Sequence, residues 1–169
     1  MTSADPTAGG SVATSLRVRR ARPADLDAVV RLRLALLREH GTHPIYGRLR
    51  LDVESRARTI FAGQLTSTGE VMFLAERDGD VVGILRCVES AASPLLEPPR
   101  YGYVSSVYVE PAARRQGVLR ALLQAAERWC TDRGMMEMRL HSVVGDDVSG
   151  TAWDHMGFEP VETVRLKKL

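Results

Sequence analysis

A strand, a short turn with glycine and a helix start follow one another between Val104 and Leu119, and this succession predicts an anion-binding loop. The first-turn amides of a helix have no partners within it and carry about half a positive charge, so they form a site for phosphate. Gly117 removes a side chain where a pyrophosphate would approach, and Arg114 and Arg115 add positive charge near the same turn. The turn lacks the Gly-Lys-Ser/Thr of a P-loop and the three glycines of a dinucleotide fold, which argues against ATP and NAD.

The same segment resembles the coenzyme A motif of the GCN5-related N-acetyltransferase (GNAT) superfamily. The matching positions are Val107, Val109, Pro111, Arg114 and Gly117. The resemblance implies that acetyl-CoA is the co-substrate, that amides near Arg115 to Arg120 hold its pyrophosphate, and that the bulged strand pairs with its pantetheine arm. Leu119 departs from the family, which most often has Gly or Ala there. On this basis the predicted cofactor-binding residues are Val107, Tyr108, Val109, Arg114, Arg115, Gln116, Gly117, Val118, Leu119, Arg120 and Trp153.

Three further segments carry the resemblance from about Leu16 to Leu166. They are residues 22–26, the Val82-Gly83 pair, and the ending from Trp153 to Glu159. Agreement of several separated segments is more specific than a single glycine turn. The resemblance implies an N-acetyltransferase that moves the acetyl group to a primary amine of a small molecule or a protein, by direct attack in a ternary complex. It also makes a homodimer plausible.

Acetyl transfer needs a neutral amine, a polarised thioester carbonyl and a proton for the departing thiolate. A backbone N–H near Val107 is the predicted donor to the acetyl oxygen. Many members of the superfamily protonate the thiolate from a Tyr that falls at Trp153 here, and some place a carboxylate where this chain has Tyr103. Ser149 and water are among the substitutes for this tyrosine, and His141 is among those for the carboxylate. The predicted catalytic residues are Tyr108, Glu110, Glu89 and His155.

Each of these residues also has a purely structural explanation. Trp153 can pack in the core or shape the acyl pocket, His141 can be a structural histidine of a strand, and Glu110 can cap a turn beside Pro111. Arg114 and Arg115 alone would suit a solvated basic surface, and the glycine after them favours cofactor contact. No metal site is predicted, because the histidines have no companion ligands at the usual spacing.

Two other functions remain open beside the enzyme. Trp153 and Leu119 favour a domain that keeps the cofactor fold without transfer activity, acting as an acyl-CoA sensor or regulatory subunit. A phosphate-binding regulator unrelated to CoA would need the turn to prefer nucleotides. The acceptor should be selected by loops, in particular residues 43–47 and 91–101, where Glu97 and the nearby Glu89 would attract a cationic amine.

The elements that must position these residues follow from apolar periodicity and turn residues. Asp78-Gly79 predicts a hairpin, and Gly134 predicts the end of the long helix that follows Gly117. The expected class is α/β (α+β), with a mixed, mostly antiparallel sheet, helices on both faces and the order β-α-α-β-β-β-α-β-α-β. The expected strands are 16–20, 71–76, 81–88, 101–109, 136–143 and 158–166, and the expected helices start at Pro23, Val53, about Leu119 and Val148.

The bulk properties predict one domain, residues 15–169, after a disordered segment at 1–14 that is rich in Ser, Thr, Ala, Gly and Pro. A formal net charge of +2 gives no reason to expect nucleic acid binding. The apolar runs are far shorter than the roughly 20 residues of a membrane helix. Cys87 and Cys130 have no paired spacing and suit a reducing cytosol, so a cytoplasmic protein is expected.

Overall fold

The computed structural model describes residues 15–143 and 145–169, so the segment predicted to be disordered, 1–14, lies outside the described residues. Five strands form one sheet in the order β1-β2-β3-β4-β5. Neighbouring strands are antiparallel except β4 and β5, which are parallel. This confirms the mixed, mostly antiparallel sheet. The strands are β1 (Leu16–Arg20), β2 (Glu70–Arg77), β3 (Asp80–Ala91), β4 (Arg100–Val109) and β5 (Met138–Arg139).

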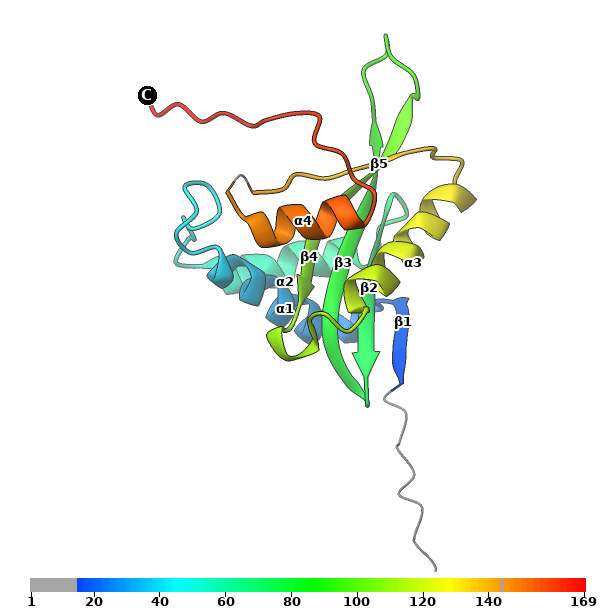
Figure 1. The fold of residues 1–169 in the computed structure, drawn as a ribbon. Coiled ribbons are helices and arrows are strands. Elements are labelled where there is room, and N and C mark those ends of the chain that lie inside the picture. Colours follow the sequence, from blue (N-terminus) through cyan, green and yellow to red (C-terminus); the bar gives the residue numbers. More distant parts are fainter. Residues whose placement is uncertain (1–14, 144) are drawn as a thin grey trace, which may run out of the picture.

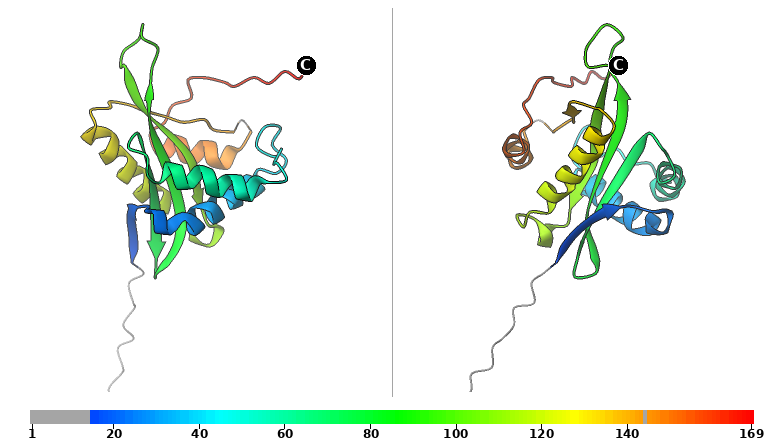
Figure 2. Two further views of the ribbon diagram at one scale, coloured as in Figure 1. Left: turned by 180° about the vertical axis from the view of Figure 1, so that it is seen from behind. Right: turned by 90° about the vertical axis from the view of Figure 1, so that its right-hand side faces the viewer.

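Helices cover both faces of the sheet, as predicted (Figures 1 and 2). α1 (Leu26–Glu39) and α2 (Val53–Gln64) lie on one face, and α3 (Val118–Asp132) and α4 (Asp147–His155) lie on the other. Short 3₁₀ turns, Pro23–Asp25 and Pro111–Ala113, precede α1 and α3. Within the part of the chain that the structure describes, no helix is long and apolar enough to cross a membrane.

The period-two pattern of the central strands divides the core into two layers. Leu74 and Ile84 pack against α1 and α2, whereas Leu85, the neighbour of Ile84 in sequence, packs against α3. Leu122 and Trp129 belong to the apolar stripe of α3 that covers this second face. The sheet is therefore anchored on both sides, and its middle strands form a rigid base for a site.

The β2–β3 hairpin turns at Asp78 and Gly79, as the Asp-Gly pair predicts. Both residues have positive φ, 52° and 92°, which is the conformation that a tight hairpin turn with right-handed strand twist requires. The hairpin aligns β3 with β4, the strand that borders the cavity described below.

The prediction of a last strand at residues 158–166 is wrong. The chain after Gly157 forms no helix or strand up to Leu169, and Val161, Val164 and Leu166 are exposed. Alternating apolar residues satisfy one requirement of a strand, but a ladder also needs a partner with free backbone groups, and Pro160 has no N–H to contribute. The predicted strand 136–143 is shorter than expected, because only Met138 and Arg139 pair with β4.

β4 departs from regular geometry at the point where the site begins. Its register against β3 shifts, so that Ser106 and Val107 together oppose one residue, and Ser106 has φ 53°. This is a β-bulge, which bends the strand. On the edge away from β3, β5 pairs only with Gly102 and Tyr103, so no strand of the described chain pairs with this edge of β4 from Val104 onward. The bulge and the divergence of β5 together open one edge of β4.

Candidate active site

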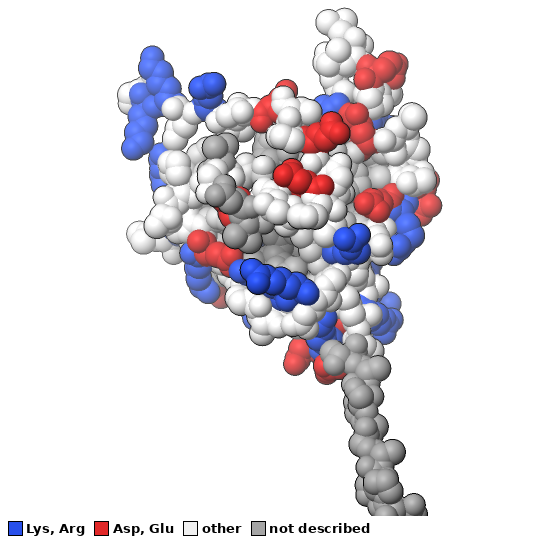
Figure 3. Space-filling model, viewed as in Figure 1, with Lys and Arg blue, Asp and Glu red and all other residues white. Residues whose placement is uncertain are grey.

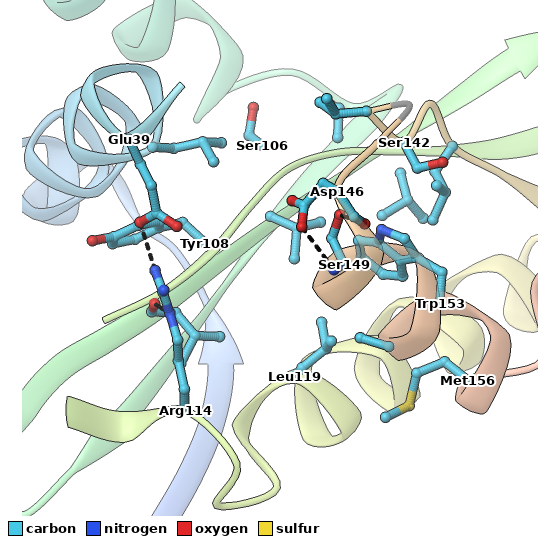
Figure 4. Close-up of a pocket in the computed structure, with 18 of the residues that line it drawn as sticks. Glu39, Ser106, Tyr108, Arg114, Leu119, Ser142, Asp146, Ser149, Trp153 and Met156 are labelled. Carbon is cyan, nitrogen blue, oxygen red and sulfur yellow. Dashed lines mark hydrogen bonds and ion pairs between the residues drawn. The ribbon is translucent and has the colours of Figure 1, made fainter. Parts of the chain in front are cut away.

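A cavity of about 930 Å³ lies along this open edge of β4. Its walls are α1 with the loop that follows it, residues 103–109 of β4, the loop that leads into α3, and the chain from Leu140 through α4 (Figure 4). Leu140, His141, Ser142 and Val143 leave the sheet to form part of the wall, which accounts for the short β5. Figure 3 shows basic and acidic side chains intermixed around the hollow on this face.

Most of the residues predicted to bind the cofactor line this one cavity. Gln116 is the exception, because its side chain donates to the Ala112 carbonyl at 2.7 Å and accepts from Arg77. Segments from β4, α3 and α4 are thus brought together as the resemblance implies. The lining residues from the predicted set are Val107, Tyr108, Val109, Arg114, Arg115, Gly117, Val118, Leu119, Arg120 and Trp153.

The turn before α3 has the geometry of an anion-binding loop. Gly117 caps the helix with φ 80°, and Arg115 also has a positive φ of 59°. The first helical hydrogen bond runs from the Ala121 amide to the Gly117 carbonyl at 3.0 Å, so the amides of Val118 to Arg120 precede the helical ladder. A Cβ added at Gly117 would meet no heavy atom within 4 Å, so the space beside this glycine is open.

The arginines of this loop have different surroundings. Arg114 donates from Nε to the Val109 carbonyl at 2.9 Å, pairs with Glu39 Oε2 at 2.6 Å, and lies over the ring of Tyr108 (Figure 4). It therefore joins α1 to the loop before α3. Arg115 and Arg120 are exposed and form no ion pair with any described residue. These two cations are the ones available to a bound anion.

The predicted catalytic residues are not brought together. Tyr108 lines the cavity, but Glu89, Glu110 and His155 do not. Glu89 bonds to Arg100 and, at 3.2 Å, to Arg133, and these two hydrogen bonds lower the pKa of its carboxyl. The other two have partners of their own, since Glu110 pairs with Arg31 and the His155 Nδ1 contacts the Thr151 carbonyl at 2.7 Å. All three therefore lie outside the cavity. The sequence shows their chemical type but not the long-range contacts that decide where their side chains point.

α4 supplies an apolar residue and a hydroxyl to the cavity. Trp153 lines it and packs edge-to-face against Phe158, with ring centroids 5.7 Å apart. Ser149 lies one turn earlier, and its backbone N–H donates to the Asp146 side chain at 3.2 Å, which caps the helix (Figure 4). The face of α4 toward β4 thus presents a hydroxyl near the indole.

Several lining residues were outside the predicted set. The Tyr103 hydroxyl lies 3.2 Å from His141 Nδ1, and burial raises the pKa of Tyr103. Arg33 interrupts the apolar pattern of α1, which is the signal that sequence offers for it. Of the two loops expected to shape the acceptor site, the first contributes Tyr46. The second does not line the cavity at any position from 91 to 101, because these residues form the far end of the β3–β4 hairpin.

The described residues contain no group of three His, Cys, Asp or Glu side chains arranged to hold a metal ion. Cys87 and Cys130 are free, buried thiols with their sulfur atoms 3.6 Å apart.

Comparison with known proteins settles the family. A model of the acetyltransferase (GNAT) family matches residues 35–158, from within α1 to three residues beyond α4. The chain belongs to this family. It is therefore an acyl-CoA-dependent N-acyltransferase of the GNAT type, and the alternative of a phosphate-binding regulator unrelated to CoA falls away.

Named relatives span most of the GNAT domain. The aminoglycoside N(6')-acetyltransferase type 1 of Stenotrophomonas maltophilia is 29% identical over 155 residues, which cover 90% of this chain and 92% of that protein. The enzyme of the same name from Klebsiella aerogenes is 31% identical over 115 residues, 66% of this chain and 74% of that protein. The solved structure of the aminoglycoside N-acetyltransferase AAC(6')-Iy in complex with CoA has a TM-score of 0.76 at 20% identity, covering 94% of this chain and 97% of that one, and shows the shared fold.

Proposed function

We propose that this protein transfers the acetyl group of acetyl-CoA to a primary amine of a small molecule, by direct attack in a ternary complex. The observation that carries the proposal is a single cavity that joins the open edge of β4 to the free amides and unpaired arginines at the start of α3. The named relatives act on aminoglycosides, which are small amines. A cavity walled by α1, β4 and α4 also suits a small acceptor better than a protein surface.

We assign the pyrophosphate and the pantetheine arm of acetyl-CoA to residues that line the cavity. The amides of Val118 to Arg120, with the Arg115 and Arg120 guanidiniums, would hold the pyrophosphate, and the open space at Gly117 lets it approach the backbone. The edge of β4 at Val107 to Val109 would pair with the pantetheine arm in the manner of an added strand. Trp153 and Leu119 would cover the apolar part of the arm.

The proposed reaction forms a C–N bond and breaks the C–S bond of the thioester. A backbone N–H near Val107 polarises the carbonyl, since donors on a rigid strand need no rearrangement when negative charge develops on oxygen. The attacking amine loses one proton, and His141, held at 3.2 Å by the Tyr103 hydroxyl, is the base we propose for it. The thiolate gains one proton, for which Ser149 is the proposed donor because Trp153 has no hydroxyl.

Ser149→Ala tests this last assignment. We expect kcat to fall on the order of a hundredfold, which is a typical contribution of a positioned proton donor, with unchanged affinity for CoA. Thr151→Ala is the matched control, because Thr151 is an exposed hydroxyl residue of the same helix that does not line the cavity. The measurement is steady-state kinetics with the best amine found. If Tyr108→Phe lowers kcat and Ser149→Ala does not, the donor is Tyr108.

The function as a whole is tested by incubating the protein with acetyl-CoA and a panel of amines, while measuring released thiol and identifying acetylated product by mass spectrometry. Amine-dependent thiol release with one acetyl group added to the amine supports the proposal. Tight CoA binding without transfer to any amine would instead indicate the sensor, which Trp153 in place of a tyrosine favours.

A further inference from the structure

Arg33 is a partly buried cation in the wall of the cavity and has no counter-ion. It lies on α1 and contributes to the lining, yet no described residue forms a hydrogen bond or an ion pair with its guanidinium. Two other partly buried arginines have carboxylate partners, Arg19 with Asp25 and Glu76, and Arg86 with Glu70. Arg77 has no carboxylate partner, but its guanidinium donates to Gln116. Arg33 thus lacks both the opposite charge and the hydrogen bonds that usually accompany a charge withdrawn from water.

The two acidic residues that line the cavity in the described chain, Glu39 and Asp146, are already engaged. Glu39 pairs with Arg114 at 2.6 Å, and the Asp146 side chain accepts a hydrogen bond from the Ser149 amide. Glu70, which pairs with the neighbouring Arg86, is likewise committed. Among the described residues that line the cavity, no other carboxylate is present to neutralise Arg33, so we infer that the counter-charge comes from what enters the cavity.

Other polar groups line the cavity together with Arg33. Burial lowers the pKa of the Arg33 guanidinium; Tyr46 opposes this shift and the positive charge of Arg86 adds to it. Tyr46 and Tyr103 line the same cavity as Arg33, and the Tyr103 hydroxyl lies 3.2 Å from His141 Nδ1. Hydroxyl and imidazole groups beside an unpaired guanidinium form a set of hydrogen-bond donors suited to anionic oxygens.

Given the proposed function, we propose that the acceptor amine carries a carboxylate or a phosphate and that Arg33 binds this group. The guanidinium presents parallel N–H groups that match two anionic oxygens, so it would also orient the amine. A polycationic aminoglycoside, the acceptor class named for the relatives, would place further positive charge against Arg33. The acceptor class of this protein therefore differs from that of the named relatives.

The experiment is calorimetric titration of the CoA-loaded protein with amines that differ in the anionic group. The probes are phenylalanine against phenylalaninamide, phosphoethanolamine against ethanolamine, and kanamycin as the polycation. We expect at least one anionic member to bind about tenfold more tightly than its neutral partner, as for a charge-assisted hydrogen bond. The preferred pair distinguishes a carboxylate from a phosphate.

Arg33→Gln should remove this preference and leave CoA affinity unchanged, and Arg33→Lys should keep part of it. Arg38→Gln is the matched control, because Arg38 is an exposed residue of the same helix outside the cavity. Equal binding within both pairs, tighter binding of kanamycin, no binding of any probe, or a preference that survives Arg33→Gln would each overturn the inference. Failure of the wild-type protein to bind CoA would instead remove the proposed function, so the two failures are distinguishable.

Discussion

Gly117→Glu should abolish measurable binding of acetyl-CoA, with a loss of affinity of about a hundredfold or more. The new carboxylate would occupy the open space beside the first turn of α3 and repel the pyrophosphate from the amides of Val118 to Arg120. A residue with a Cβ at φ 80° also costs about 1–2 kcal/mol of folding free energy. Isothermal titration calorimetry with acetyl-CoA and CoA measures the affinity directly.

Gly134→Glu is the control for this substitution. Gly134 also has a positive φ, 72°, and open space around it, but it lies just beyond the other end of α3 and outside the cavity. It therefore reproduces the backbone strain and the added charge without touching the proposed site. Equal loss of CoA binding in both variants, or retained binding in a folded Gly117→Glu protein, would contradict the assignment of the pyrophosphate site.

Gly102→Ala should destabilise the fold by about 1–3 kcal/mol, as overpacking of a close-packed core does. A Cβ at this position would overlap the Cys130 sulfur and lie 3.2 Å from the Cys87 sulfur, both in the buried core. Gly102 also starts the pairing of β4 with β5, so its neighbours cannot move away freely. Chemical denaturation followed by circular dichroism gives the free energy of unfolding.

The matched control for Gly102→Ala is Gly63→Ala. Gly63 lies in α2 with nothing near its added Cβ, so this change should stabilise the protein by up to about 1 kcal/mol. Combining Gly102→Ala with Cys130→Ala should recover part of the lost stability, because the smaller side chain makes room for the methyl group. A Gly102→Ala protein as stable as wild type would show that β4 and α3 pack less closely than the structure shows.

Sequence reasoning succeeded where a local signal determines local structure. Asp78-Gly79 specifies its hairpin, and the apolar stripe of α3 between Gly117 and Gly134 specifies both ends of the helix to within a residue or two. The order strand, turn and helix start between Val104 and Leu119 was predicted for the same reason, since the three are consecutive in the chain. The structure places most of these residues along one cavity, and their contact with CoA stays a prediction.

The misses depend on long-range contacts that no local pattern encodes. The segment after Gly157 alternates like a strand but finds no partner. Glu89 was chosen for its carboxylate, which the fold places between Arg100 and Arg133. Arg33 and Tyr103 reach the cavity only because α1 and β4 cross there, and Arg33 becomes informative only once its lack of a counter-ion is visible.

The ion pair between Glu39 and Arg114 has a consequence for redesign of the acceptor specificity. Arg114 belongs to the loop that leads to the proposed cofactor site, and Glu39 belongs to the helix that also carries Arg33. Replacing Glu39 to admit a bulkier acceptor would release a guanidinium beside Tyr108 and remove a tie between two walls of the cavity. Libraries that vary α1 should therefore randomise positions 39 and 114 together, because a change at one position removes the ion-pair partner of the other.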